Sequence, residues 1–240
     1  MLFRSLPELT AAIHAARNEA EAKKAAARLA HVKIEGQTSL AHLHQMAERL
    51  AERHPIHPLP LMQRIGRILP KEAVVIDETV SSGNGLRRFL KSDDHQSFYG
   101  MRGGGIGWGL PAAIGVKLAL PDRPVVALIG DGSAMYTIQG LWTAARENLR
   151  MVFVIINNYS YRILKQRTNA MKGLAAQADL YVGMDLDRPR VDFVSVARGL
   201  GLTAVQAKTL SDFDDLLTAA LKHDGPTLID VEVDRSWKPV

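Results

Sequence analysis

Uninterrupted runs of apolar residues are the clearest pattern in this chain. Three of them lie at residues 73–77 (AVVID), 123–130 (RPVVALIG) and 150–156 (RMVFVII). Because polar residues do not alternate with apolar ones, each run is typical of a strand covered on both faces, as in a parallel sheet. Two further strands are predicted near residues 203–206 and at residues 227–233. The pattern therefore predicts a sheet built from parallel strands.

Stretches with helical spacing alternate with these strands. In chain order they cover residues 59–68, 136–148, 192–199 and 211–222. In the last of them, Ser211 with Asp214 resembles a capping box in which Asp replaces the usual Glu. Strands and helices alternate in this way in βαβ units, whose crossovers place helices over the sheet. We therefore expect an α/β fold with a doubly wound parallel sheet and helices on both faces.

The N-terminal part of the chain has a different pattern. Residues 7–30 are rich in Ala, Glu and Lys and predict a helix with a thin apolar face. A second helix is predicted over residues 39–53, with Ser39 as its N-cap. The sequence HPIHPLP then holds three prolines in seven residues, which is typical of a stiff linker. We therefore expect a helical appendage at residues 1–54 and a main domain at residues 55–240.

Composition and charge narrow the possible classes of protein. Apolar residues make up 47% of the chain and charged residues 23%, the balance of a globular domain. Cysteine is absent, which excludes disulfide scaffolds and thiol nucleophiles and fits a cytoplasmic protein. Most of the net charge of +5 lies in residues 1–70, so the main domain is nearly neutral and no nucleic-acid partner is expected. No apolar run is long enough for a membrane span or a signal core, so no membrane association is expected.

Polar residues follow two of the predicted strands at the point where each strand ends. Gly130-Asp131-Gly132-Ser133 follows one strand and Asn157-Asn158-Tyr159-Ser160 follows the next, with 24 residues between Gly132 and Asn157. That spacing holds one crossover helix and one strand, so adjacent parallel strands would bring Asp131 and Asn158 to the same edge of the sheet. Carboxylate, amide and backbone carbonyl oxygens suit Mg²⁺ or Ca²⁺. Flanking glycines and a helix N-terminus suit a phosphate, so we expect a metal–diphosphate site.

These residues resemble the diphosphate-binding fingerprint of thiamine-diphosphate-dependent enzymes, in which GDG is followed after 24–27 residues by NN. The resemblance extends to IDETVSSG (76–83), GGGIGWGLPAAIGVKLALP (103–121) and GPTLIDVEVD (225–234). Residues 56–234 are similar to the C-terminal diphosphate-binding domain of the benzoylformate decarboxylase and acetolactate synthase branch. Residues 1–54 are similar to the end of the central domain that precedes it in that family.

The resemblance implies a role for individual residues. The side chains of Asp131 and Asn158 and the backbone carbonyl of Ser160 would bind Mg²⁺. The residues that would contact the diphosphate of thiamine diphosphate are Gly132 and Ser133 on one side and Thr79 and Ser81 on the other.

The remaining cofactor contacts implied by the resemblance involve the organic part of the cofactor. The carbonyl of Gly104 would accept a hydrogen bond from the 4′-amino group, and Ile106 would be the bulky residue under the bent cofactor. Tyr161 is a further cofactor-binding candidate. It lies just past the metal loop with Ile163, and both could instead line a substrate pocket or belong to the core.

The chain lacks one element that the family needs. Its members use a glutamate on a separate pyrimidine-binding domain, and the glutamates of this chain lie in stretches that match the other domain. We therefore expect no catalytic residue here, but a subunit of a split enzyme or a fragment. It would act as a homo- or hetero-oligomer with a pyrimidine-binding subunit or domain on a 2-oxo acid, as a lyase (decarboxylase) or a transferase (carboligase).

Two alternatives of other classes stay open. The first is a non-catalytic module that binds the cofactor or a partner for assembly. The second is a nucleotide-binding domain, because residues 107–112 fit a loose form of the dinucleotide motif GxGxxA. No strand is predicted directly before those glycines, and no acidic residue follows at the expected distance.

Overall fold

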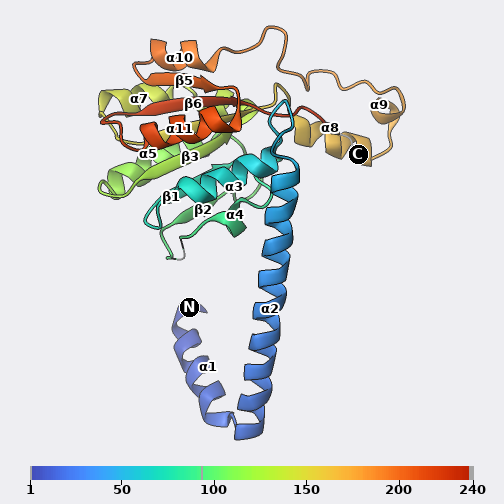
Figure 1. Ribbon diagram of the computed structural model, residues 1–240, viewed down its shortest axis with the longest axis vertical. Coiled ribbons are helices and arrows are strands. Elements are labelled where there is room, and N and C mark those ends of the chain that lie inside the picture. Colours follow the sequence, from blue (N-terminus) through green and yellow to red (C-terminus); the bar gives the residue numbers. More distant parts are fainter. Residues whose placement is uncertain (1, 93, 238–240) are drawn as a thin grey trace. The chain divides into compact units, whose positions relative to one another are not determined.

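The computed structural model describes residues 2–92 and 94–237 of the chain (Figure 1). Two compact units are present, Met1–Gln45 and Met46–Val240. The proposed cofactor residues all belong to the second unit. Each unit is therefore described on its own.

A six-stranded parallel sheet forms the centre of the second unit. Its strands, in chain order, are β1 (Val74–Glu78), β2 (Phe98–Gly100), β3 (Val125–Gly130), β4 (Val152–Asn157), β5 (Thr203–Ala207) and β6 (Thr227–Glu232). Their order across the sheet is β2-β1-β3-β4-β6-β5, and every neighbouring pair is parallel. The five predicted strands are confirmed. The edge strand β2 was not predicted, because three half-buried residues carry no distinct apolar pattern.

Helices cover both faces of this sheet, which confirms the predicted fold class. The helices of this unit are α3 (Pro58–Ile68), α4 (Leu86–Phe89), α5 (Gly109–Ala119), α6 (Asp131–Thr137), α7 (Gly140–Arg146), α8 (Arg162–Ala170), α9 (Leu174–Gln177), α10 (Phe193–Gly199) and α11 (Leu210–Ala220), of which α8 and α9 lie beside the sheet and not over a face of it. The core of one face is built from α5, α7 and α10 together with inward-facing strand residues. Figure 1 shows α3 and α11 over the other face, where Asp214 of α11 binds Arg64 of α3 at 2.7 Å.

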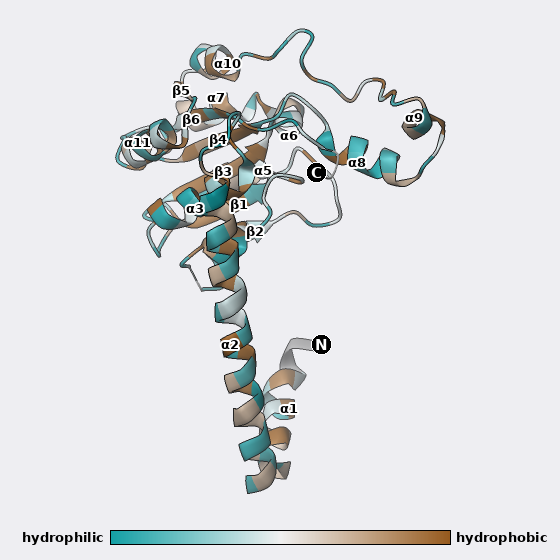
Figure 2. Ribbon diagram, turned by 45° about the vertical axis from the view of Figure 1, so that its right-hand side comes forward, coloured by the Kyte–Doolittle hydropathy of each residue, from teal (hydrophilic) through white to brown (hydrophobic). Residues whose placement is uncertain are grey.

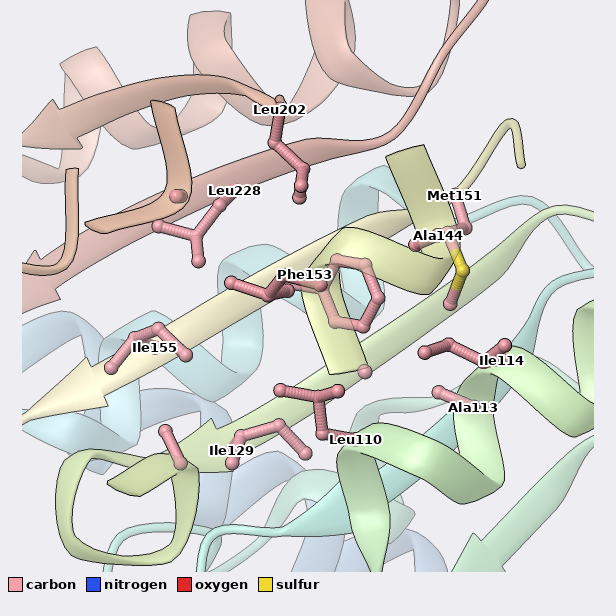
Figure 3. Close-up of a cluster of buried hydrophobic side chains, with 14 of the residues drawn as sticks. Leu110, Ala113, Ile114, Ile129, Ala144, Met151, Phe153, Ile155, Leu202 and Leu228 are labelled. Carbon is pink, nitrogen blue, oxygen red and sulfur yellow. The ribbon is translucent and has the colours of Figure 1, made fainter. Parts of the chain in front are cut away.

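The central strands are apolar on both faces because helices cover both. In Figure 2 the ribbons of β3 and β4 are hydrophobic along most of their length, whereas α8 is largely hydrophilic. Phe153 of β4 is fully buried, and Figure 3 shows its ring between residues of α5 and α7. This packing fixes the sheet rigidly, and with it the loops at the carboxyl ends of the strands.

Two helix predictions in the main unit are corrected in detail. Residues 136–148 do not form one helix: α6 begins at Asp131, directly after β3, and α7 follows from Gly140. The capping box of α11 uses Thr209 and Asp212 rather than Ser211 and Asp214. Asp214 instead forms ion pairs with Arg64 and Arg67 of α3. The local pattern suggested a cap, but this side chain is used in a tertiary contact.

The first unit contains α1 and most of α2, and the boundaries of both helices differ from the prediction. They are α1 (Leu2–Ala16) and α2 (Glu19–Arg49), so the helix break lies at residues 17–18 and Ser39 lies inside a helix. Asn18 explains the break, because its side chain accepts a hydrogen bond from the Glu21 N–H at 2.9 Å and Glu21 accepts one in return from the Asn18 N–H. Within the described residues, no helix has an apolar stretch long enough to cross a membrane.

The proline-rich stretch after α2 is not a free linker. Ile56 pairs with Val233, and Pro58 to Pro60 form the buried first turn of α3, capped by the side chain of His57. The boundary between the compact units lies earlier, between Gln45 and Met46. The relation of residues 1–54 to a central domain stays a prediction.

The capping box offers a direct test of the fold at α11. Replacement of Thr209 by Ala removes the acceptor for the Asp212 N–H, which lies 3.0 Å from the hydroxyl. We expect the free energy of unfolding to fall by about 1 kcal/mol. Ser211→Ala, two residues further along and exposed, is the matched control. It should change the free energy of unfolding by less than about 0.5 kcal/mol. Urea denaturation of both variants measures the difference, and equal losses would contradict the assignment of the cap.

Candidate cofactor site

The two polar loops meet because β3 and β4 are parallel neighbours. Gly130 pairs in register with Ile156, so the residues that follow both strands lie at the same edge of the sheet. Between them is a narrow cleft of about 50 Å³. Nine of the ten predicted site residues line it: Asp131, Asn158, Ser160, Gly132, Ser133, Thr79, Ser81, Ile106 and Tyr161. Gly104 does not line it and is exposed.

Asp131 places a buried carboxylate on one wall of this cleft. The residue is only 3% exposed, and its carboxylate accepts a hydrogen bond from the Ser160 N–H at 3.2 Å. Burial raises the pKa of Asp131 to about 6, although backbone N–H groups of Gly132, Ser160 and Tyr159 partly oppose the shift. Among the described residues no basic side chain forms an ion pair with it. The carboxylate therefore has a strong preference for a positively charged ligand.

Asn158 contributes an oxygen that the fold itself does not use. Asn158 is 4% exposed, and its Oδ1 is buried without a hydrogen-bond donor among the described residues. A buried acceptor without a partner costs about 1–3 kcal/mol, so such an atom in a site usually serves a ligand. The carbonyl of Ser160 likewise receives no backbone N–H in the described chain, whereas the neighbouring Tyr159 carbonyl accepts one from Leu186.

The neighbouring Asn157 has a different, structural task. Its Nδ2 donates to Asp230 on β6 at 3.1 Å, and its Oδ1 accepts the Tyr159 N–H at 3.2 Å. Burial raises the pKa of Asp230 to about 6. Asn157 thus fixes the turn, while Asn158 is turned into the cleft. The structure separates the roles of two adjacent asparagines that sequence alone does not distinguish.

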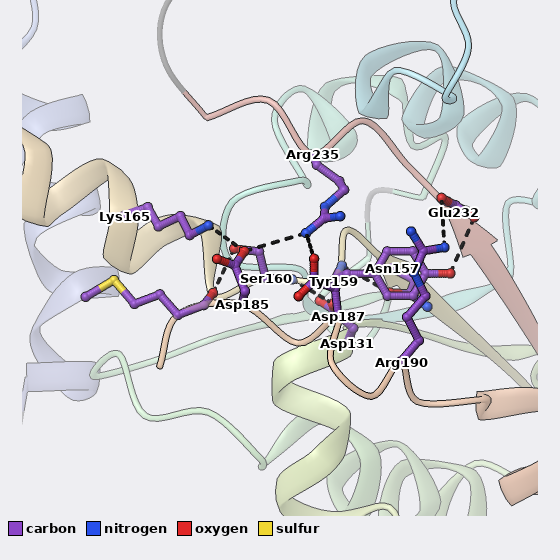
Figure 4. Close-up of polar contacts among 11 residues, drawn as sticks. Asp131, Asn157, Tyr159, Ser160, Lys165, Asp185, Asp187, Arg190, Glu232 and Arg235 are labelled. Carbon is purple, nitrogen blue, oxygen red and sulfur yellow. Dashed lines mark hydrogen bonds and ion pairs between the residues drawn. The ribbon is translucent and has the colours of Figure 1, made fainter. Parts of the chain in front are cut away.

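Tyr159 occupies a backbone conformation that favours glycine. Its φ is +52°, in the left-handed region, which costs roughly 1 kcal/mol for a residue with a side chain. The ring lies under the guanidinium of Arg190, 4.3 Å from the ring centroid, with Arg235 at 5.8 Å, and its hydroxyl contacts Glu232 (Figure 4). Cation–π contacts of this kind offset the strain.

A segment at residues 184–187 pairs with the turn that carries Ser160. The Met184 carbonyl accepts hydrogen bonds from the Ser160 hydroxyl and the Tyr161 N–H, both at 2.9 Å, and Leu186 donates to the Tyr159 carbonyl. Figure 4 shows the ion pairs that hold this segment: Lys165 with Asp185, and Arg235 with Asp187. The turn is therefore supported from outside the cleft and does not depend on a ligand for its shape.

The opposite wall of the cleft follows β1. Asp77 accepts hydrogen bonds from the Thr79 N–H at 3.0 Å and from its hydroxyl at 2.7 Å, which fixes the start of the turn. Val80 has a φ of +52°, an unusual conformation for a β-branched residue. Strain of this kind is concentrated at functional sites. Arg162, which also lines the cleft, binds Ser81 and Ser82 of this turn.

Glu78 is a structural residue that the sequence did not single out. It is 1% exposed, and its two carboxylate oxygens accept the backbone N–H groups of Gly107, Trp108 and Gly109. The carboxylate therefore holds the segment that follows Ile106. A side chain at Gly107 would collide with Tyr136, which explains this glycine of the GxGxxA match by packing.

The donor set of the cleft fits a hard divalent cation. It offers one carboxylate, one unpartnered amide oxygen and one free carbonyl, and Mg²⁺ takes such oxygens together with those of a phosphate. No cluster of three or more His, Asp or Glu in the described residues could hold a metal by itself. A cation here would therefore depend on amide and carbonyl oxygens and on oxygens of its ligand. The ring of Tyr161 packs so closely on Gly132 that no side chain fits there.

Comparison with known proteins identifies the family. Residues 81–231 match the family described as "Thiamine pyrophosphate enzyme, C-terminal TPP binding domain". IlvX of Mycobacterium tuberculosis, named as an acetolactate synthase large subunit, is 44% identical over 173 residues, covering 70% of this chain and 33% of that protein. Benzoylformate decarboxylase of Pseudomonas aeruginosa is 34% identical over 177 residues, covering 74% and 32%.

A solved structure agrees with these matches. The thiamine diphosphate-dependent 4-hydroxybenzoylformate decarboxylase of Rhodococcus jostii superposes with a TM-score of 0.70 at 34% identity, covering 76% of this chain and 33% of that one. The chain thus spans about a third of the length of these relatives. Since the family match covers more than half of the chain and includes the polar loops after β3 and β4, the chain belongs to the thiamine pyrophosphate enzyme family and contains its C-terminal cofactor-binding domain.

Proposed function

We propose that the cleft anchors the diphosphate of thiamine diphosphate through a Mg²⁺ ion held by Asp131, Asn158 and Ser160. The observation that carries this proposal is the buried Oδ1 of Asn158, which has no donor among the described residues and lies in the same cleft as the unpaired carboxylate of Asp131. A divalent cation would satisfy both atoms at once. It would also remove the cost of burying a single negative charge.

The surrounding residues would position the diphosphate. Gly132 and Ser133, in the first turn of α6, would face it from one wall, and Thr79 and Ser81 from the other. All four lie on segments that the fold already holds in place, so little order has to be created on binding. Tyr161 would cover the loop at Gly132.

Two further residues would act on the organic part of the cofactor. Ile106 lines the cleft and would support the bent cofactor, while the exposed carbonyl of Gly104 would be available to its amino group. The chemistry that thiamine diphosphate supplies when bound is a nucleophilic carbon that adds to the carbonyl of a 2-oxo acid. The part of this chain is to bind and orient that group. The named relatives support decarboxylation or carboligation of a 2-oxo acid as the reaction.

Activation of the cofactor requires a second protein segment in this proposal. No glutamate lines the cleft among the described residues. Glu78, the most buried one, already accepts three backbone N–H groups, and both of its oxygens are engaged. We therefore propose that the chain is a subunit or part of an oligomeric enzyme and turns over only with a pyrimidine-binding domain.

The metal assignment predicts unequal effects of two substitutions. Asp131→Ala should abolish Mg²⁺-dependent binding of thiamine diphosphate, because it removes the only formal charge among the ligands. Asn158→Ala should weaken binding without abolishing it, since water can replace an amide oxygen. Isothermal titration calorimetry with Mg²⁺ measures both, and Asp215→Asn on the exposed side of α11 is the control. Unchanged affinity in Asp131→Ala would show that the metal is held elsewhere.

The pKa of Asp131 predicts how the metal-free protein responds to pH. Its pKa of about 6 lies above the ordinary value of 3.8, so the folded chain keeps a proton that the unfolded chain has released. The contribution of Asp131 to the free energy of unfolding should therefore fall by up to about 3 kcal/mol as pH rises from about 4 to about 6.

Comparison with Asp131→Asn isolates this effect from other titrating groups. Relative to the parent, the metal-free variant should gain stability as pH rises through that range, and saturating Mg²⁺ at pH 8 should stabilise the parent only. Thermal unfolding of the parent and the variant at pH 4.5 and 8, each with and without Mg²⁺, gives the eight values needed. A parent–variant difference that stays constant with pH would contradict the uncompensated burial of Asp131.

The partner requirement predicts no 2-oxo acid turnover by the purified chain, even at saturating Mg²⁺ and thiamine diphosphate. Addition of a protein that carries the pyrimidine-binding domain should restore it, and Ile106→Ala should then lower kcat while leaving diphosphate binding intact. Full activity of the chain alone would overturn the proposal and mean that an activating residue lies within it.

A further inference from the structure

Arg162 is a buried cation in the wall of the cofactor cleft. It is the first residue of α8, directly after the turn that carries Ser160, and it is only 6% exposed. It lines the cleft together with Asp131 and Ser81. None of the cofactor contacts proposed above involves this side chain, and no local sequence pattern marks it.

The contacts of Arg162 are all with neutral oxygens. Its Nε donates to the Ser81 hydroxyl at 3.1 Å, and one terminal nitrogen donates to the Ser81 carbonyl at 2.9 Å and the Ser82 hydroxyl at 2.7 Å. The other terminal nitrogen donates to the Asp234 carbonyl at 3.2 Å. Four of the five N–H groups of the guanidinium are thus used, and one has no acceptor among the described residues.

The charge of Arg162 is not matched by a carboxylate in contact. Within the described chain no Asp or Glu side chain forms an ion pair with it. Burial lowers the pKa of Arg162, while the more distant charges of Asp234 and Asp131 raise it. A buried cation with only neutral acceptors is costly, and proteins keep such groups where a ligand supplies the opposite charge.

Together, Asp131 and Arg162 make the cleft electrically polar. One wall has a buried negative charge without a cationic contact, and the other has a buried positive charge without an anionic contact. Among the described residues, Asp131 and Arg162 do not form an ion pair with each other. A metal–diphosphate unit has the matching polarity, with a cation for the Asp131 wall and an anion for the Arg162 wall.

We infer that Arg162 is a diphosphate-binding residue, which supplies the positive charge on the wall formed by Ser81 and Ser82. This inference rests on the proposed function and adds a residue to the same site. It predicts unequal effects on binding of the anion and binding of the metal. Loss of the Arg162 charge should weaken binding of the anion, but should leave metal binding at Asp131 unchanged or slightly stronger because a repulsive charge is gone.

The test measures metal binding and pyrophosphate binding separately on the 240-residue chain. Mn²⁺ binding is followed by electron paramagnetic resonance, and binding of inorganic pyrophosphate in the presence of Mg²⁺ by calorimetry. Arg162→Met should weaken pyrophosphate binding roughly 10- to 100-fold, the usual effect of losing a charged hydrogen-bond partner, with no loss of Mn²⁺ affinity. Arg162→Lys, which keeps the charge, should recover part of the pyrophosphate affinity, and added NaCl should affect Arg162→Met least.

Ser82→Ala is the control for a purely structural role. It removes the shortest tie between Arg162 and the turn but keeps the charge, so pyrophosphate affinity should change less than in Arg162→Met. Arg162→Gln provides a second neutral variant if Arg162→Met does not fold. Parallel losses of Mn²⁺ and pyrophosphate binding in the neutral variants, without recovery in Arg162→Lys, would overturn the inference in favour of a structural tie.

The outcomes also separate this inference from the proposed function. If the parent chain binds neither Mn²⁺ nor pyrophosphate, the proposed metal–diphosphate site fails, and the role of Arg162 fails with it. If the parent binds both and the neutral Arg162 variants bind pyrophosphate equally well, only the inference about Arg162 fails.

Discussion

The parallel pairing of β3 with β4 is the constraint on which the site depends. Because Gly130 lies in register with Ile156, the first residues after the two strands meet at one edge of the sheet. A one-residue shift in this pairing would move Asp131 and Asn158 apart by about 3.3 Å along the strands. The fully buried strand residues, Phe153 among them, prevent such a shift, since each must stay between the helices that cover it. The apolar core thereby determines the spacing of the polar residues in the cleft.

The cleft concentrates polar groups that the fold leaves without partners. Asp131, Asn158 and Arg162 are each more than nine-tenths buried, and none of them has a neutralising contact for its charge or its free oxygen among the described residues. Elsewhere in the same sheet, the buried Asp230 receives hydrogen bonds from Asn157 and Gln206. A protein selected for stability alone would pair or remove the three cleft residues. Their persistence beside strained turns at Val80 and Tyr159 indicates that the site is built for a charged ligand.

Sequence patterns predicted the elements that depend on local periodicity and on chain spacing. The five long strands, the fold class and the meeting of the two polar loops all follow from apolar runs and from the length of one crossover. Helix ends were less predictable: Asn18 and Thr209 cap helices where Ser39 and Ser211 were expected, because several residues in each stretch could form a cap. The roles of Glu78 and Arg162 depend on contacts with residues 29 to 81 positions away, which no pattern in a single sequence encodes.

The hydrogen bonds of Glu78 affect whether this chain could activate a cofactor by itself. A carboxylate that is to polarise a cofactor must keep an oxygen available for it, but both oxygens of Glu78 are bound by the segment 107–109. Those bonds in turn hold Ile106 at the mouth of the cleft. Glu78, the one buried glutamate among the described residues, thus serves to position this segment, and the other polar groups of the cleft are the ones proposed to hold the metal and the diphosphate. In the proposed function, anchoring and activation are therefore separate tasks, and the cleft residues of this chain serve the first of them.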